Sequence, residues 1–428
     1  MEPPTSCDDE QNSILHKIIR IIFFVSTFSW SFNRFEEYAT EGAPAEKIVM
    51  RILPLMITAA YLVLGKYRPR LKNLLRPVFW PVLAYLFFGV FFGLFGIQPL
   101  LSMWKGAELL IATAFIACTC DDLPSLKREF HAYSFYIELL MYATVVLALI
   151  SPERGFLDSP SFVPWIRGYL PMLNPNTVGF LAAVALTRLL FTPVKLKPLR
   201  LALISGVLLC AQSRTQYAAM VVVFIVFVVD AFRTRQRRRV FWSMIGGAVA
   251  LLFLFGFSDL VIKVFQRGQS ADTMSRLSGR TDYWAIAWAH AGLTGGGFAT
   301  GSRSLIFEAS GVFQQGAVNL HSTYLEAILG AGFLGAIPFL FNILWNVIRQ
   351  GMRFLLRCRS FDGMFTAFAL LLLARTIMSN GPSLFTIDYC LLIMIWFAIS
   401  ITSKEVQNQT EPPKPRVRTE LELGGKIQ

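Results

Sequence analysis

Residues 215–232 read TQYAAMVVVFIVFVVDAF, and residues 233–239, RTRQRRR, follow them directly. The first run is almost uniformly apolar and approaches the roughly 20 residues that a helix needs to cross a bilayer. Basic side chains just beyond such a run are typical of the cytoplasmic end of a span. The two stretches together predict a membrane-spanning helix whose C-terminal end is anchored in the cytoplasm.

Similar apolar runs recur along the whole chain. Of its 428 residues, 54% are hydrophobic and only 16% are charged, a composition that excludes an ordinary soluble protein. The sequence predicts an all-α, polytopic membrane protein with about 12 transmembrane helices. They are placed at residues 16–32, 48–65, 78–95, 100–119, 132–151, 175–192, 200–212, 215–232, 240–257, 321–348, 363–379 and 384–402.

Basic residues outnumber acidic residues by 40 to 27, which gives a net charge of +13. The cations gather in alternate short loops, within residues 66–76, 127–128, 195–200, 233–239 and 349–359. With the amino terminus inside, all these loops and both termini are cytoplasmic, as the positive-inside rule requires. The run at 233–239 is therefore interpreted as a topology anchor, and we expect no nucleic-acid partner.

This topology divides the chain into four parts. Residues 1–257 hold predicted helices one to nine with short loops, and residues 258–320 form one large loop on the outer side. Residues 321–402 hold the last three helices. Residues 403–428 are rich in Pro, Glu and Lys, and we expect them to form a disordered cytoplasmic tail.

The large outer loop is expected to carry the function, because long loops between short ones are usually functional. It contains two helical patterns, around residues 259–267 and 281–291, and then the run Gly295-Gly296-Gly297. The triple glycine matches neither a Walker loop nor a dinucleotide fingerprint, since no strand precedes it and no Lys-Ser/Thr follows. We interpret it as a flexible turn.

Several cations lie on the outer side, against the charge rule, and three of the arginines among them are candidates for a function. Arg214 sits in a tight turn between the seventh and eighth spans, Arg280 in the large loop, and Arg375 near the outer end of its span. A cation at the edge of the hydrocarbon needs a partner. For any one of them, snorkelling to headgroups or pairing with Asp282, Glu308 or Asp388 is an equal alternative to a functional role. The turn at Arg214 is too short to form its own surface, which favours projection into a cavity.

His321 stands alone at the junction between the large loop and the tenth span. An imidazole whose ordinary pKa is about 6.5 can take up a proton at neutral pH. A lone histidine is more often structural than catalytic, so the residue type leaves both roles open.

The sequence His321-Ser322, nine residues, then Gly332-Phe333-Leu334-Gly335 resembles the signature of bacterial O-antigen ligases. Two further elements are similar to features of these enzymes, namely Ser213-Arg214-Thr215 and the segment from Ser278 to Asp282. Asn174-Pro175-Asn176 is similar to a motif of the wider ligase and polymerase superfamily. The resemblance covers roughly residues 170 to 390, whereas the first third of the chain matches only in hydropathy.

The resemblance implies a glycosyl transfer at the periplasmic face of the bacterial inner membrane. The donor would be a polysaccharide on undecaprenyl pyrophosphate, and the acceptor a sugar hydroxyl of lipid A-core, both reached from the membrane lipid. His321 would be the general base, and Arg214 and Arg280 would bind the pyrophosphate, with Arg375 as a weaker third. Asp388 and Asn176 would support them, Asp388 either by orienting His321 or by pairing with Arg375.

With one base and no second carboxylate nucleophile, we expect direct displacement with inversion. Clustered arginines can stabilise the leaving group as a metal would, so we expect no cofactor and no metal. Two alternatives stay open, a polymerase of the same superfamily and a polysaccharide transporter. A transporter predicts two related halves with charges near the midplane, whereas the unusual charges of this chain gather at one face.

Overall fold

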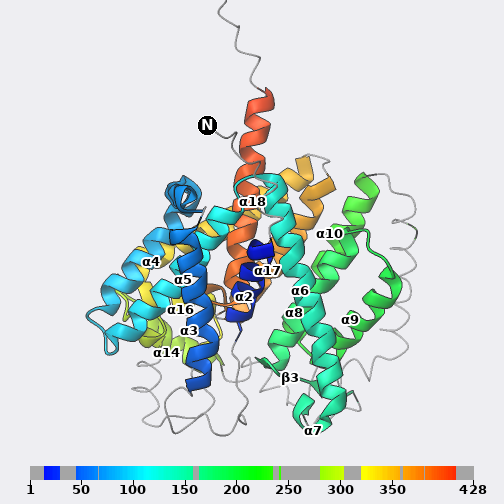
Figure 1. Ribbon diagram of the computed structural model, residues 1–428, viewed down its shortest axis with the longest axis horizontal. Helices are drawn as coiled ribbons and strands as arrows, with labels where there is room; N and C mark the ends of the chain where they lie inside the picture. The colour runs from blue at the N-terminus through cyan, green and yellow to red at the C-terminus, as the bar shows by residue number, and fades with distance from the viewer. Residues whose placement is uncertain are drawn as a thin grey trace, which may run out of the picture.

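The structure is a computed structural model that describes residues 14–28, 45–65, 67–157, 163–234, 241, 280–302, 320–356, 360–379 and 381–410. These residues are mostly helical (Figure 1). The longer helices are α2 (Ile14–Ser26), α3 (Ala45–Leu64), α4 (Trp80–Gly93), α5 (Pro99–Thr119), α6 (Leu123–Ile150), α8 (Pro175–Phe191), α9 (Lys197–Ala211), α10 (Arg214–Arg233), α14 (Arg280–Ala289), α16 (Thr323–Leu356), α17 (Ser360–Met378) and α18 (Ile387–Thr410). Short helical segments are η2 (Arg68–Leu75), η3 (Pro77–Phe79), α7 (Pro152–Gly155) and η5 (Gly381–Ser383).

Each predicted apolar span coincides with a described helix, except 240–257, of which only residue 241 is described. By length and composition, 4 of the described helices can cross a membrane, namely α5, α6, α10 and α16. The number rises to 5 if the bent pair Arg68–Leu75 and Pro77–Gly93 is one span. Others, among them α8 and parts of α3, α17 and α18, are apolar but shorter. The apolar helices indicate a membrane protein, and the full set of predicted spans stays a prediction.

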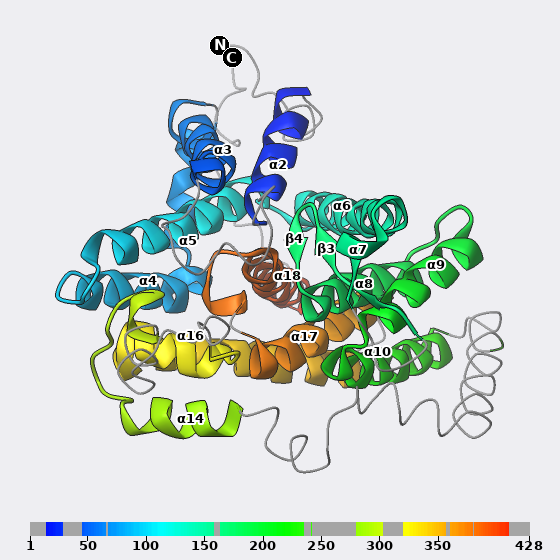
Figure 2. The same ribbon diagram turned by 90° about the horizontal axis from the view of Figure 1, so that it is seen from below.

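Helix α18 lies at the centre of the described bundle. Figure 2 shows it end-on, and α5, α6, α16 and α17 pack around it. Every residue from Ile387 to Ile399 is buried, which is the pattern of a helix that is apolar on all sides. The helix continues to Thr410, past the predicted start of the tail at Ser403. Residues 411–428 lie outside the described part of the chain.

Two short hairpins connect α7 to α8, and the all-α prediction missed them. Strand β1 (Phe156–Leu157) pairs antiparallel with β2 (Trp165–Ile166), and β3 (Gly168–Tyr169) pairs antiparallel with β4 (Met172–Leu173). Strands of two residues are too short to show a period-two pattern in the sequence. The hairpins lead the chain directly into the start of α8.

The large predicted loop is described only in part. Its expected helix at 259–267 lies outside the described residues, while the one at 281–291 corresponds to α14. The Gly295-Gly296-Gly297 run is packed rather than a free turn, which corrects our interpretation. The Gly296 and Gly297 N–H groups donate to the carbonyls of Leu329 and Gly330 at 2.8 and 2.9 Å.

Helix α16 bends at the point where the triple glycine packs against it. Gly332 has φ 65° and ψ 176°, outside the helical region. A Cβ on Gly295 would come within 2.3 Å of the Gly330 carbonyl oxygen, and a Cβ on Gly335 within 2.9 Å of the Phe88 Cβ on α4. The glycines of the Gly-x-x-Gly motif therefore permit close backbone packing at the break and along α4.

A buried carboxylate joins α6, α8 and α9. The Glu138 side chain is fully buried and accepts hydrogen bonds from Arg188 at 2.5 Å and from two nitrogens of Arg200 at 2.6 Å. Tyr142 donates to the same carboxylate at 2.6 Å. Because one carboxylate serves two guanidinium groups, its loss would leave the buried Arg188 and the half-buried Arg200 without their shared partner.

We expect Glu138→Gln to lower the free energy of unfolding by about 3–5 kcal/mol, since it breaks a buried ion pair on one side only. The measurement is the unfolding midpoint of the purified protein in detergent. Asp121→Asn is the matched control, because the Arg76–Asp121 pair, at 2.7 Å, is about one-third exposed on both sides. The control is expected to lose at most about 1 kcal/mol. Equal losses in the two variants would contradict the structural role of Glu138.

Candidate active site

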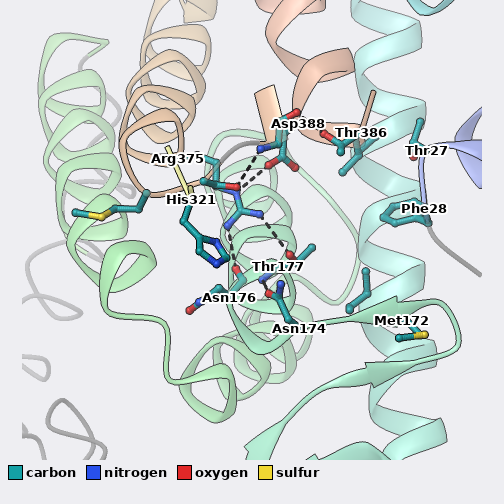
Figure 3. A pocket seen from close by; sticks show the side chains of 15 residues that line it. Thr27, Phe28, Met172, Asn174, Asn176, Thr177, His321, Arg375, Thr386 and Asp388 are labelled. Carbon is teal, nitrogen blue, oxygen red and sulfur yellow. Dashed lines mark hydrogen bonds and ion pairs between the residues drawn. The ribbon is translucent and has the colours of Figure 1, made fainter. Parts of the chain in front are cut away.

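A pocket of about 190 Å³ lies among the described residues where the end of α2, the starts of α8 and α18, and the end of α17 meet His321, two residues before α16 (Figure 3). Its wall combines cationic, neutral polar and apolar side chains. The lining residues are Thr27, Phe28, Met172, Leu173, Asn174, Asn176, Thr177, His321, Arg375, Met378, Ser379, Gly381, Thr386, Ile387 and Asp388.

Helix α8 begins at the pocket because of its capping residues. Asn174 is the N-cap, and its side chain accepts a hydrogen bond from the Thr177 N–H at 2.8 Å. Pro175 occupies the first turn, where its missing N–H costs nothing. This cap fixes Asn176 and Thr177 in the pocket wall. The predicted Asn-Pro-Asn motif thus lies at the site.

Arg375 projects from the last turn of α17 and is 6% exposed. Its Nε donates to Asp388 Oδ2 at 2.8 Å, and its terminal nitrogens reach the Asn176 carbonyl oxygen at 3.5 Å and the Thr177 hydroxyl at 3.3 Å (Figure 3). The guanidinium carbon lies 4.8 Å from the centre of the Phe180 ring. Of the two predicted roles of Asp388, the structure shows the pairing with Arg375.

His321 lies beside Arg375 in the pocket wall, and its ring points toward Asn176 in Figure 3. Burial, with smaller contributions from the positive charges of Arg280 and Arg375, lowers the pKa of His321 to about 4. Both effects disfavour the protonated ring, because a buried imidazolium loses hydration and is repelled by neighbouring cations. His321 is therefore neutral at pH 7, in the state that accepts a proton.

Arg280, the first residue of α14, is brought to the edge of this pocket from the large loop. Its guanidinium lies 3.8 Å from the sulfur of Met378, which lines the pocket. Burial and the charge of Arg375 lower the pKa of the Arg280 guanidinium. The structure thus places Arg280, His321 and Arg375 together, although they are far apart in the sequence.

Arg214 begins α10, next to the same region. Ser213, the residue before it, packs against α8, since a Cβ on Gly179 would come within 2.7 Å of the Ser213 Cβ. Gly179 is next to Phe180, and the centre of the Phe180 ring lies 4.8 Å from the guanidinium carbon of Arg375. Arg214 is half-buried and is not among the residues that line the pocket. Its predicted contact with a pyrophosphate stays a prediction.

Among the side chains that the structure describes at the site, positive charge exceeds negative charge. Two guanidinium groups, Arg280 and Arg375, face one carboxylate, Asp388, and a neutral imidazole. Such an arrangement fits an anionic ligand that brings a polar group to the imidazole. Among the described residues, no three His, Cys, Asp or Glu side chains are grouped so that they could hold a metal ion.

Several pocket residues were not predicted. Thr27 and Phe28 at the end of α2, Thr386 before α18, and Met172 of β4 line the site from distant parts of the chain. Their residue types are common in helix ends and loops, so no local pattern marks them. The sequence did contain a signal for Thr177, because an N-cap side chain such as that of Asn174 usually accepts a hydrogen bond from the N–H of the second or third residue after it.

The chain was compared with curated proteins and with models of protein families. No curated protein matches the chain. The family model described as O-Antigen ligase matches residues 199–340. This segment contains Arg214, Arg280, His321 and the Gly332 break, whereas Arg375 lies beyond it. Residues 199–340 are thus similar to this family, and the similarity supports membership of the O-antigen ligase superfamily.

Proposed function

We propose that this protein is a glycosyltransferase that moves a polysaccharide from undecaprenyl pyrophosphate to a sugar hydroxyl of lipid A-core. The observation that carries the proposal is a neutral imidazole, His321, held next to Arg280 and Arg375 at one pocket. Transfer from a lipid diphosphate needs both a proton acceptor and cationic groups for the departing phosphate. The family match supports the same class of donor.

The reaction that fits these groups is a direct displacement. The acceptor hydroxyl gives its proton to the imidazole of His321 as its oxygen forms a bond to the anomeric carbon of the donor. The bond between that carbon and the phosphate oxygen breaks, and its electron pair leaves with undecaprenyl pyrophosphate. One displacement inverts the anomeric configuration. The guanidinium groups stabilise the negative charge of the leaving group, and we propose that no metal ion is required.

The two arginines at the pocket differ in what they can offer to a phosphate. Arg375 is already bound to Asp388 at 2.8 Å and to the start of α8, so its side chain is fixed and its charge partly compensated. Arg280 has a sulfur as its described contact, at 3.8 Å. A guanidinium can bind two phosphate oxygens at once. We therefore assign Arg280, with Arg214 as its predicted companion, to the pyrophosphate, and Arg375 to holding the pocket.

The arrangement of the helices supports a periplasmic site. Helix α10 begins at Arg214 and α16 begins next to His321, and both run away from the pocket toward their basic ends at Arg233 and Arg353. The positive-inside rule assigns those basic ends to the cytoplasm. Helix α2 ends at the pocket and α18 begins there, so both termini belong to the opposite side. We propose the bacterial inner membrane as the location.

A polymerase of the same superfamily would use the same chemistry, because its acceptor also presents a sugar hydroxyl. We expect His321→Ala to lower turnover by about 100- to 10,000-fold, the usual range for loss of a general base. The measurement is transfer in proteoliposomes that contain lipid-linked glycan and lipid A-core. Products attached to the core identify a ligase, and longer lipid-linked chains identify a polymerase. Full turnover by His321→Ala would remove the general-base role.

The charge of the donor should change the basicity of His321. The charged groups that face the ring are Arg280 of α14 and Arg375 of α17, with Asp388 of α18 bound to Arg375. In the free enzyme, burial and these charges give His321 a pKa of about 4. The acid limb of the pH profile of kcat/KM should therefore lie near pH 4. A bound pyrophosphate offsets the two cations and raises the pKa of the imidazole. The acid limb of the pH profile of kcat should therefore lie at a higher pH than that of kcat/KM. A limb of kcat/KM near pH 6.5 would contradict the buried, cationic surroundings of His321.

The assignment of Arg280 can be tested by a change that keeps its charge. Arg280→Lys should lower kcat/KM by about 10- to 100-fold, because an ammonium cannot make two parallel hydrogen bonds to a phosphate. Arg167→Lys is the matched control, since Arg167 lies in the hairpin segment and its Nε donates to the Arg154 carbonyl oxygen. The control should retain normal turnover. Undiminished kcat/KM in Arg280→Lys would show that a point charge suffices there.

A further inference from the structure

The residue before His321 is held at both of its peptide groups. The Leu320 N–H donates to Glu326 Oε1 at 3.1 Å, and the Leu320 carbonyl oxygen accepts from Trp284 Nε1 at 2.8 Å. Leu320 is 1% exposed and packs with Ala287, Leu325 and Leu329. Trp284 and Glu326 are not among the residues that line the pocket, so their contacts lie behind the imidazole.

The backbone of His321 needs such support because it is left-handed. Its φ is 52°, a conformation that costs a residue with a side chain on the order of 1–3 kcal/mol and persists only where the surroundings enforce it. The peptide that carries the Leu320 carbonyl also carries the His321 N–H. The φ of His321 is measured relative to the plane of this peptide. A hydrogen bond from Trp284 to the Leu320 carbonyl therefore fixes the plane and restricts the φ of His321.

Glu326 is itself fixed in place. Its second oxygen, Oε2, accepts a hydrogen bond from the Ser302 hydroxyl at 2.6 Å, and both residues are buried. On the other side of His321, the Thr323 hydroxyl donates to the Ser379 carbonyl oxygen at 2.5 Å, and Ser379 lines the pocket. His321 is thus held from the large loop on one side and from the end of α17 on the other.

We propose that Trp284 and Glu326 are positioning residues, which hold the His321 imidazole in the pocket through the peptide groups of Leu320. The proposal rests on the general-base role of His321. Without these hydrogen bonds, the backbone of His321 can relax to the negative φ that most residues adopt. The imidazole would then leave the acceptor hydroxyl, and a displacement of about 1 Å can cost about 100-fold in rate.

The sharpest test is Trp284→Phe, which removes the indole N–H and keeps an aromatic ring on the same helix. We expect kcat to fall by about 10- to 100-fold, while KM for lipid-linked glycan stays within about twofold. Trp288→Phe is the matched control, because Trp288 is on the same helix and is 60% exposed. It should retain normal kcat. Rates are measured per amount of monodisperse protein, so that a folding defect is not counted as a catalytic one.

Two variants of Glu326 give an independent measurement. Glu326→Gln keeps an oxygen that can accept from the Leu320 N–H, so its kcat should stay within about threefold of the native value. Glu326→Ala loses both hydrogen bonds and should lose about as much kcat as Trp284→Phe. Equal kcat in the Gln and Ala variants would overturn the role of this carboxylate.

A pH profile separates positioning from general stability. In Trp284→Phe, an imidazole that leaves its buried position beside Arg280 and Arg375 regains a more ordinary pKa, so the acid limb of kcat/KM should move from near pH 4 toward 6.5. A variant that is merely less stable would keep the native limb, and that result would overturn the proposal.

If His321→Ala is inactive while Trp284→Phe has native kcat, the positioning role fails and the general base stands. If His321→Ala is fully active, the proposed function itself fails.

Discussion

The site depends on the buried ion pair between Arg375 and Asp388. A charged side chain in an apolar bundle costs several kcal/mol unless a partner and further hydrogen bonds compensate it. Here the two side chains are 8% and 3% exposed, and Arg375 also contacts the Asn176 carbonyl and the Thr177 hydroxyl. The pair therefore ties the end of α17 to the starts of α18 and α8, which form the wall of the pocket.

A second constraint places the histidine against this wall. The three consecutive glycines pack on the α16 segment that contains the Gly332 break, and they bring the large loop to the helix through backbone hydrogen bonds. The same loop supplies Arg280, Trp284 and Ser302. Because glycines have no side chains, the loop packs closely against α16. This packing brings Arg280 and Trp284 of the loop to His321.

The electrostatics of the pocket follow from these two constraints. An imidazole that is buried beside two guanidinium groups stays neutral, because protonation would add a third positive charge to a poorly hydrated space. A neutral imidazole next to the guanidinium groups of Arg280 and Arg375 is suited to a reaction in which a hydroxyl loses its proton while a phosphate departs. The donor would also restore the basicity of the ring by bringing negative charge to the guanidinium groups.

The helical character of the chain and its hydrophobic spans can be predicted from the amino-acid order, because hydrophobic length and the asymmetry of basic loops are local properties. The sequence also singled out His321, Arg214 and Arg280 as unusual, since polar residues at the outer ends of apolar runs are visible along the chain. Only the tertiary structure decided that Arg375 pairs with Asp388, that α18 is central, and that the triple glycine is packed. It also decided which distant residues, such as Phe28 and Trp284, lie around or behind the histidine. These features arise from contacts between segments far apart in the chain, where close packing and the need to pair buried charges select one arrangement that no local pattern specifies.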